Sequence, residues 1–210
     1  MFEVDQSRMT PDDGTAKAVS RGDDQADRAL MARVRDGDTA AFNVLVERHS
    51  PSIYRVAYRM LGDGHEAEDI VQESFTRLWI NAPQWQPSGG GLGGWLHRVG
   101  MNLCLDRLRK TKRIAPVEPP EMPDNGPAAD KVMVSDEIGA TVDTCLRQLP
   151  ERQAAALVLS YYEGLSNNES AAILELNVKA LESLLVRARR GMRALLESEG
   201  VLAADVEQLT

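Results

Sequence analysis

The stretch LPERQAAALVLSYYEGLSNNESAAILELNVKALESLLVRARRGMRALL, residues 149–196, decides the fold of the C-terminal half of this chain. Gly164 suits the end of a first helix. Ser166, with Glu169 three residues later, has the capping-box pattern that begins a second helix. Asn177 suits the N-cap of a third. The stretch therefore predicts three helices separated by tight turns.

The third of these predicted helices has two chemically different faces. Its apolar stripe is formed by Leu181, Leu184, Leu185, Ala188, Met192 and Leu195. Its polar and basic face is formed by Lys179, Ser183, Arg187 and Arg190. Two short helices, a tight turn and a basic second helix predict a helix-turn-helix, the motif that places its second helix in the major groove of DNA. The alternative is a plain three-helix bundle whose arginine face is only solvated.

The N-terminal half also follows helical spacing, and no alternating β-branched run or Asn-Gly hairpin is present. Asp63, with Glu66 three residues later, predicts a helix start. A fourth helix is expected to begin near Gly94 or Trp95 and to run through residues 95–110. The sequence therefore predicts an all-α protein.

Charge and proline content divide the chain into segments. Residues 114–140 are strongly acidic and hold five of the ten prolines, so they are expected to form a flexible linker rather than a long helix. Residues 28–113 are net basic, whereas residues 1–27 are net acidic. We therefore expect a disordered acidic tail over 1–27, a helical domain over 28–113, the Pro-rich acidic linker over 114–140, a helix-turn-helix domain over 141–198 and a C-terminal tail over 199–210.

The glycine-rich stretch QWQPSGGGLGGWLHRV, residues 84–99, allows three interpretations. A phosphate-binding loop would need Gly-Lys-Ser/Thr at its end and a strand before it, and this stretch has neither. A flexible surface loop is the simplest alternative. The third interpretation is a contact with single-stranded nucleic acid, because Trp85 could pack against bases beside the basic helix that follows.

That helix is dense in positive charge. Its basic residues are Arg98, Arg107, Arg109, Lys110, Lys112 and Arg113, against one acidic residue, Asp106. Basic residues near a helix C-terminus also suit the helix dipole, so a solvated helix end is one explanation. The density of charge favours an electrostatic contact with phosphates.

Composition excludes several classes of function. The net charge of −8 argues against strong autonomous binding to nucleic acid. No apolar run is long enough to span a membrane, and the acidic N-terminus does not resemble a signal peptide. Cys104 and Cys145 lie far apart, which indicates no metal cluster and a reduced, cytoplasmic setting. No catalytic pairing involves His49, His65 or His97, so we expect no enzyme, no metal and no cofactor.

Three stretches in collinear order resemble an extracytoplasmic-function sigma factor of bacterial RNA polymerase, within the sigma-70 family. EAEDIVQESFTRLW, residues 66–79, resembles the segment that binds core polymerase. GGWLHRVGMNLCLDRLRK, residues 93–110, resembles the segment that melts the promoter and binds its minus-10 element. Residues 149–193 resemble the domain that binds the minus-35 element. The resemblance implies a transcription initiation factor without catalysis of its own.

The resemblance also implies roles for individual residues. The core-polymerase surface would comprise Asp69, Ile70, Val71, Gln72 and Glu73. Ile70 and Val71 could equally pack in the core. The loop before Trp95 would capture an unstacked base, and the minus-10 set would comprise Trp85, Gly90, Arg98, Asn102, Arg107, Arg109 and Lys110. The minus-35 set would comprise Lys179, Ser183, Arg187 and Arg190.

Two positions depart from the common pattern of the family. Its turns often have glycine where this chain has Glu175, and Glu182 lies within the predicted recognition helix. The resemblance implies core polymerase, promoter DNA and an anti-sigma factor as partners. The alternative is an autonomous helix-turn-helix regulator that uses residues 28–113 for sensing or dimerisation, but such a domain would need neither the basic helix nor the linker.

Overall fold

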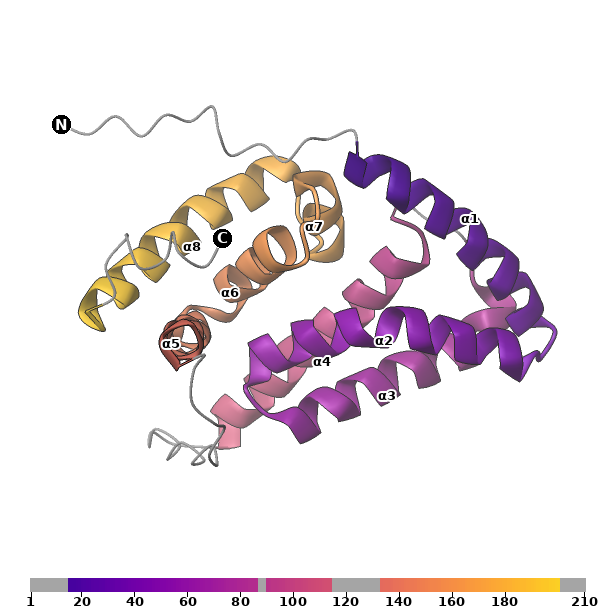
Figure 1. Cartoon of the computed structure of the whole chain (residues 1–210), viewed down its shortest axis with the longest axis horizontal. Helices are drawn as coiled ribbons and strands as arrows, with labels where there is room; N and C mark the ends of the chain where they lie inside the picture. The colour runs from indigo at the N-terminus through magenta and orange to yellow at the C-terminus, as the bar shows by residue number, and fades with distance from the viewer. Residues whose placement is uncertain (1–14, 87–89, 115–132, 201–210) are drawn as a thin grey trace.

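The structure of the chain, a computed structural model, describes residues 15–86, 90–114 and 133–200. These residues form helices joined by short turns (Figure 1). No strand occurs within those ranges, so the prediction of an all-α fold is confirmed.

The first four helices form what we call the N-terminal unit. Its elements are α1 (Thr15–Arg35), α2 (Thr39–Leu61), α3 (Gly64–Asn81), the 3-10 turn η2 (Ala82–Gln84) and α4 (Gly91–Ile114). Helices α2, α3 and α4 pack on one another, and α1 packs against α2 and α4. The start of α3 follows the predicted cap, because the Asp63 side chain accepts a hydrogen bond from the Glu66 backbone N–H at 2.9 Å.

Helix α1 begins inside the segment that was predicted to be a tail. It starts at Thr15, and the side chains of Asp27 and Met31 are buried against the rest of the unit. Leu30 and Val34 lie on the same side of the helix and join the core. The apolar residues of this stripe lie just after the predicted tail, and the helix that carries them extends back into its acidic residues. Residues 1–14 lie outside the described ranges.

The remaining helices form what we call the C-terminal unit. Its elements are α5 (Met133–Gln148), α6 (Glu151–Leu157), the π-helical turn η3 (Val158–Tyr162), α7 (Asn167–Ile173) and α8 (Val178–Ser198). Helix α5 begins before residue 140, so part of the predicted linker is helical, while 115–132 lie outside the described ranges. The predicted stop at Gly164 has a left-handed backbone, with φ of +62°.

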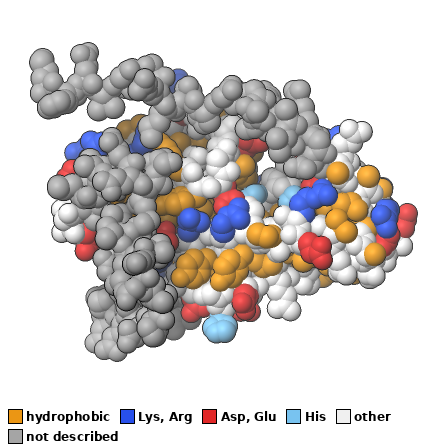
Figure 2. Space-filling view, viewed as in Figure 1, with side chains coloured by type: hydrophobic (Ala, Val, Ile, Leu, Met, Phe, Trp, Pro, Cys, Tyr) orange, Lys and Arg blue, Asp and Glu red, His pale blue; other side chains and the backbone are white. Residues whose placement is uncertain are grey.

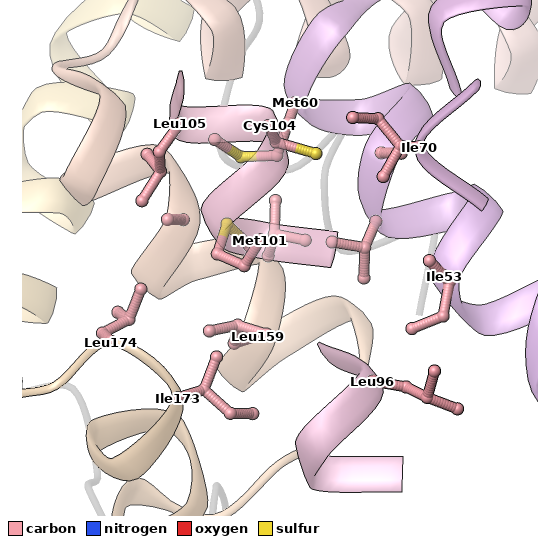
Figure 3. Packing of buried hydrophobic residues seen from close by; sticks show 14 of the residues in the cluster. Ile53, Met60, Ile70, Leu96, Met101, Cys104, Leu105, Leu159, Ile173 and Leu174 are labelled. Atoms are coloured by element: carbon pink, nitrogen blue, oxygen red, sulfur yellow. The ribbon is translucent and has the colours of Figure 1, made fainter. Parts of the chain in front are cut away.

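The two units pack directly on each other. Their buried apolar side chains form one contiguous cluster. Figure 3 shows Met101 and Leu105 of α4 on the side that faces Leu159, Ile173 and Leu174 of the C-terminal unit. Burying a side chain of this size stabilises a fold by about 1.5–3 kcal/mol, so the contact between units is part of the core.

Candidate nucleic-acid interface

Helices α7 and α8 form the predicted helix-turn-helix. Ser166 Oγ accepts a hydrogen bond from the Glu169 backbone N–H at 3.3 Å, and Glu169 Oε2 accepts one from the Ser166 N–H at 2.9 Å. Asn177 Oδ1 accepts a hydrogen bond from the Ala180 N–H at 2.8 Å, which begins α8. The caps expected from the sequence are therefore confirmed.

The turn between α7 and α8 is held from both sides. Glu175 has a φ of +54°, the one positive φ outside glycine among the described residues. A side chain in this left-handed conformation costs about 1–2 kcal/mol, which is why related turns often use glycine. Arg152 Nη2 donates to the Leu174 carbonyl at 2.7 Å, and Arg98 Nη2 of α4 lies 2.6 Å from Glu175 Oε1. These contacts offset part of the conformational cost.

The polar face of α8 carries the four residues predicted to contact the minus-35 element. Lys179, Ser183, Arg187 and Arg190 are all exposed, opposite the buried leucines of the helix. Arg187 Nε donates to the Ser183 carbonyl at 3.3 Å, so the arginine stem lies along its own helix. Within the described residues no carboxylate pairs with Lys179, Arg187 or Arg190, and these positive charges are available to phosphates or base edges.

The glycine-rich segment becomes helical earlier than expected. Helix α4 begins at Gly91 rather than near Gly94 or Trp95. Gly90 and Gly91 have φ of +96° and +62°. A Cβ on Gly91 would clash with the Asp24 carboxylate of α1, which would have to move, and the left-handed φ of Gly91 itself favours glycine.

Trp85 does not have the predicted role of a stacking platform. Its side chain is 7% exposed and belongs to the core, and its carbonyl accepts a hydrogen bond from Arg35 Nη2 at 3.4 Å. The indole Nε1 is buried without a partner in the described structure. A base could not reach the ring face without displacing neighbouring core residues. The contact with Arg35 joins positions fifty residues apart, which local sequence patterns do not reveal.

A cavity of about 220 Å³ lies beside the glycine-rich start of α4. One wall consists of residues of the N-terminal unit, including His49, Gly93 and Trp95, and the other of Glu169 and Ile173 near α7. The cavity borders Gly93, in the segment predicted to accommodate an unstacked base, and that role stays a prediction. In the observed arrangement, α7 closes the opposite side.

A buried carboxylate of α1 orients part of the cavity wall. Asp27 is 2% exposed, and its two oxygens bind Arg48 Nη1 at 2.5 Å and His49 Nε2 at 2.7 Å. The contact with Asp27 fixes the His49 ring at the cavity wall, against Gly93. The sequence pattern placed Asp27 in the predicted tail, so this buried role was not expected.

The predicted minus-10 residues on α4 have different partners. Asn102 and Lys110 are exposed. Arg109 Nη1 lies 3.1 Å from Asp106 Oδ1 one turn away. Arg107 turns toward α3, where its guanidinium lies 3.2 Å from Glu66 Oε1 and 3.5 Å from Asp69 Oδ2. Arg107 therefore links α4 to α3 through two carboxylates of the same unit.

The predicted polymerase-binding residues separate into surface and core positions. Asp69, Gln72 and Glu73 are exposed on α3, and Val71 is partly buried. Ile70 is 1% exposed and packs in the core, so the core-packing alternative holds for this residue. The Glu73 carboxylate lies 2.8 Å from Arg77 Nε along the same helix. The exposed part of the face is rich in carboxylates, which suits a basic partner surface.

Positive charges on the N-terminal unit are interrupted by carboxylates. Figure 2 shows basic side chains next to acidic and hydrophobic ones across the middle of the molecule, rather than one uninterrupted basic face. Several of the carboxylates come from the C-terminal unit, such as Glu175 against Arg98 and Glu151 against Lys112 at 2.8 Å. The observed arrangement thus neutralises basic residues that strand binding would use.

The described residues hold no group of three His, Cys, Asp or Glu side chains placed to bind a metal ion. Cys104 and Cys145 are both free and buried, and burial raises the pKa of the Cys104 thiol to about 12. Such a thiol is a poor nucleophile, which fits a role in packing. Across the described ranges, none of the helices has the length and apolar character that crossing a membrane requires.

Comparison with known protein families gives two matches in the same order as the two units. The family described as Sigma-70 region 2 matches residues 45–114, which cover most of α2, α3 and α4. The family described as Sigma-70, region 4, matches residues 140–192, which include α6, α7 and most of α8.

The chain is also similar to curated proteins over most of its length. It is 38% identical over 164 residues to the ECF RNA polymerase sigma factor SigE of Mycolicibacterium smegmatis. The matched residues are 75% of this chain and 63% of SigE, so the chain spans slightly less than two thirds of that protein. It is 33% identical to the ECF RNA polymerase sigma factor SigW of Bacillus subtilis over 174 residues, 78% of this chain and 92% of SigW.

Solved structures show the same fold. The chain resembles CnrH in its complex with the cytosolic domain of CnrY, with a TM-score of 0.63 and 30% identity over 82% of this chain and 98% of CnrH. It also resembles the sigma factor RpoE of Bartonella quintana in complex with the anti-sigma factor NepR, with a TM-score of 0.58 and 21% identity over 74% of this chain and 96% of RpoE.

Proposed function

Because the chain belongs to the extracytoplasmic-function group of the sigma-70 family of RNA polymerase sigma factors, we propose that three of its surfaces bind core polymerase, the minus-35 duplex and the minus-10 strand. Sigma factors are in general regulators of transcription without enzymatic activity. An autonomous regulator with a sensing N-terminal domain is not favoured, because that half matches sigma region 2.

Core polymerase binds the exposed carboxylate face of α3. Asp69, Gln72 and Glu73 supply polar and charged contacts, and the partly exposed Val71 supplies an apolar one. Ile70 acts from the core by holding α3 against its neighbours. Charge complementarity at such a face favours rapid and specific association with a basic partner.

The minus-10 strand binds along the glycine-rich start of α4 and its exposed polar face. Gly90 lines the cavity and has a left-handed backbone conformation. The other proposed contacts lie farther along the helix, at Arg98, Asn102, Arg109 and Lys110. Extruding a base costs a few kcal/mol, which contacts in the cavity and to the phosphates must offset. Two predicted residues act indirectly: Trp85 supports the segment from the core, and Arg107 links α4 to α3.

The minus-35 duplex binds the polar face of α8. Lys179, Ser183, Arg187 and Arg190 form one exposed stripe on a helix whose N-terminus is fixed by the turn before it. This is the placement in which a recognition helix enters the major groove. The acidic net charge of the chain fits this role, because polymerase supplies much of the general affinity for DNA.

Partners and location follow from the same function. We propose that the chain works in the cytoplasm, where polymerase and promoter DNA are found, that it catalyses no reaction itself, and that an anti-sigma factor holds it inactive. The complex of the related fold RpoE with the anti-sigma factor NepR supports this last part. The polymerase-binding unit comprises α1–α4 and the minus-35 unit α5–α8, and residues 115–132 of the predicted linker connect them in the sequence.

The collinear arrangement of an acidic α3 face, a glycine-rich start of α4 and a helix-turn-helix carries this proposal. The direct test is retention of purified core RNA polymerase on the immobilised chain. Stoichiometric retention that Asp69→Lys combined with Glu73→Lys weakens would support it. Absence of retention by the parent chain would contradict it.

A further inference from the structure

Ser52, Arg55 and His97 converge on one carboxylate of the other unit. Ser52 Oγ lies 2.5 Å from Glu163 Oε2, and Arg55 Nη2 lies 3.2 Å from the same oxygen. Arg55 Nε donates to Glu163 Oε1 at 3.4 Å. His97 Nε2 lies 2.9 Å from Ser52 Oγ and 3.7 Å from Glu163 Oε2. Three side chains of the N-terminal unit thus surround a single oxyanion.

The three donors come from two packed helices of the N-terminal unit, and His97 is oriented by a contact that does not involve Glu163. Ser52 and Arg55 lie one turn apart on α2, and His97 lies on α4. The His97 ring is oriented by its Nδ1, which bonds to the Gly93 carbonyl at 2.8 Å. The only acidic group that the described structure gives this cluster comes from the C-terminal unit, at the end of η3. If that unit moved away, the cluster would lose its anion.

The cluster combines side chains of the kind that bind a phosphate. A carbonyl only accepts, so His97 Nδ1 carries a hydrogen toward Gly93. Ser52 donates its one hydrogen to Glu163. A guanidinium, a hydroxyl and an imidazole beside one carboxylate form an environment equally suited to a phosphate.

The ion pairs between the units all have the same polarity. The N-terminal unit supplies the cation and the C-terminal unit the carboxylate in each of these pairs among the described residues. They are Arg55–Glu163, Arg59–Asp143, Arg98–Glu175 and Lys112–Glu151. The phosphates of a nucleic-acid strand carry negative charge, as these carboxylates do, and would bind the same basic side chains.

We propose that Ser52, Arg55 and His97 form a phosphate site for the melted promoter strand, which Glu163 occupies in the closed chain. His97 lies one helical turn from Gly93 and itself lines the cavity that α7 closes. The C-terminal unit is therefore an intramolecular competitor of the strand. When the two units separate, a phosphate of the strand takes the place of the Glu163 carboxylate. This inference rests on the proposed function, because it takes the strand to bind at α4.

The first test measures strand binding by the holoenzyme of the chain and core polymerase. The probe is a short fluorescent single-stranded DNA of mixed sequence, since phosphate contacts do not depend on sequence. Each phosphate contact contributes about 0.7 to the slope of log affinity against log salt for single strands. Arg55→Ala is expected to reduce that slope by about 0.7. Arg77→Ala, which removes an exposed arginine of α3, should leave it unchanged.

The second test uses the free chain and the same probe. Glu163→Gln combined with Glu175→Gln is expected to raise the affinity about fivefold or more, within the usual range of coupling between sites. Adding Arg55→Ala should cancel most of that gain. Glu182→Gln removes one exposed carboxylate from α8 and serves as the charge control; it should raise the affinity little.

The outcomes separate the inference from the proposed function. Equal salt slopes for Arg55→Ala and Arg77→Ala, in a parent holoenzyme that binds the strand, would overturn the phosphate site alone. Equal affinities of the free parent and the Glu163→Gln, Glu175→Gln variant would overturn the competition. A parent holoenzyme that binds no strand would overturn the proposed function and the inference with it.

Discussion

Arg98 of α4 and Glu175 of the helix-turn-helix form an ion pair of 2.6 Å across the two units of this chain. Glu175 holds that position in a left-handed backbone conformation, with φ of +54°. The pair joins a residue proposed to bind the minus-10 strand to the turn that positions the minus-35 helix. The conformational cost at the Glu175 turn is thereby linked to whether Arg98 is available to bind the minus-10 strand.

Replacing Glu175 with glycine should stabilise the chain. Glycine adopts a positive φ without steric cost, which is worth about 1 kcal/mol here. The lost ion pair offsets little, because its side chains are 51% and 60% exposed. Chemical denaturation should show a higher free energy of unfolding for Glu175→Gly. Glu175→Ala, which keeps the cost and loses the pair, should be slightly destabilised, and equal stability of both variants would contradict the argument.

The contact at Glu163 should weaken in acid. Burial acts to raise the pKa of the Glu163 carboxyl. Hydrogen bonds with His97, Ser52 and Arg55 act in the opposite direction and together outweigh burial, so the pKa lies below its ordinary value of 4.5. A carboxyl with a lowered pKa stabilises the fold at pH values above its ordinary pKa, and this stabilisation is lost as the pH falls through the lowered pKa.

The difference in free energy of unfolding between the parent and Glu163→Gln should therefore persist at neutral pH and shrink below pH 4.5. Denaturation curves recorded over this acid range give that difference directly. A difference that stays constant down to the lowest pH at which the parent remains folded would show that the Glu163 charge does not stabilise the contact.

Arg107 and Lys110 should behave differently in strand binding, although the sequence places both in the same basic cluster. Arg107 is engaged by Glu66 and Asp69, so Arg107→Ala should leave the salt dependence of strand binding by the holoenzyme unchanged. Lys110 is exposed, and Lys110→Ala should reduce the salt slope by about 0.7 if it contacts one phosphate. Equal slopes for the two variants would refute this distinction.

Reversing charge on α3 should weaken association with core polymerase. Asp69→Lys combined with Glu73→Lys replaces two exposed carboxylates by cations, which a basic partner surface repels. Interferometry with core polymerase should show a slower association, and circular dichroism should show unchanged helix content. Glu68→Lys reverses a neighbouring exposed charge on the same helix and is the matched control. The same loss in the control would point to net charge rather than to this face.

Local signals in the sequence were sufficient for much of the fold. The capping box of Ser166 and Glu169 and the caps at Asp63 and Asn177 depend on residues within four positions of each other, and the structure has all of them. The exposed stripe of α8 follows from helical periodicity alone. These features do not depend on distant parts of the chain.

Features that depend on tertiary packing could not be predicted in this way. Trp85 is buried and in contact with a side chain fifty residues away, and Arg107 is paired with carboxylates on a different helix. Asp27 lies in an acidic segment, and only its approach to Arg48 and His49 shows that it is a buried ion-pair partner. Composition assigns such residues to a class, whereas their roles depend on which helix they face.

In vitro transcription tests the central claim most directly. Purified core RNA polymerase is combined with the parent chain on fragments of its own genome, and transcript start sites are mapped. A sigma factor of this kind should direct new start sites that share two upstream motifs at a fixed spacing, and these sites should be lost when Arg187→Ala and Arg190→Ala are combined in α8. Start sites no different from those of core polymerase alone would contradict the central claim.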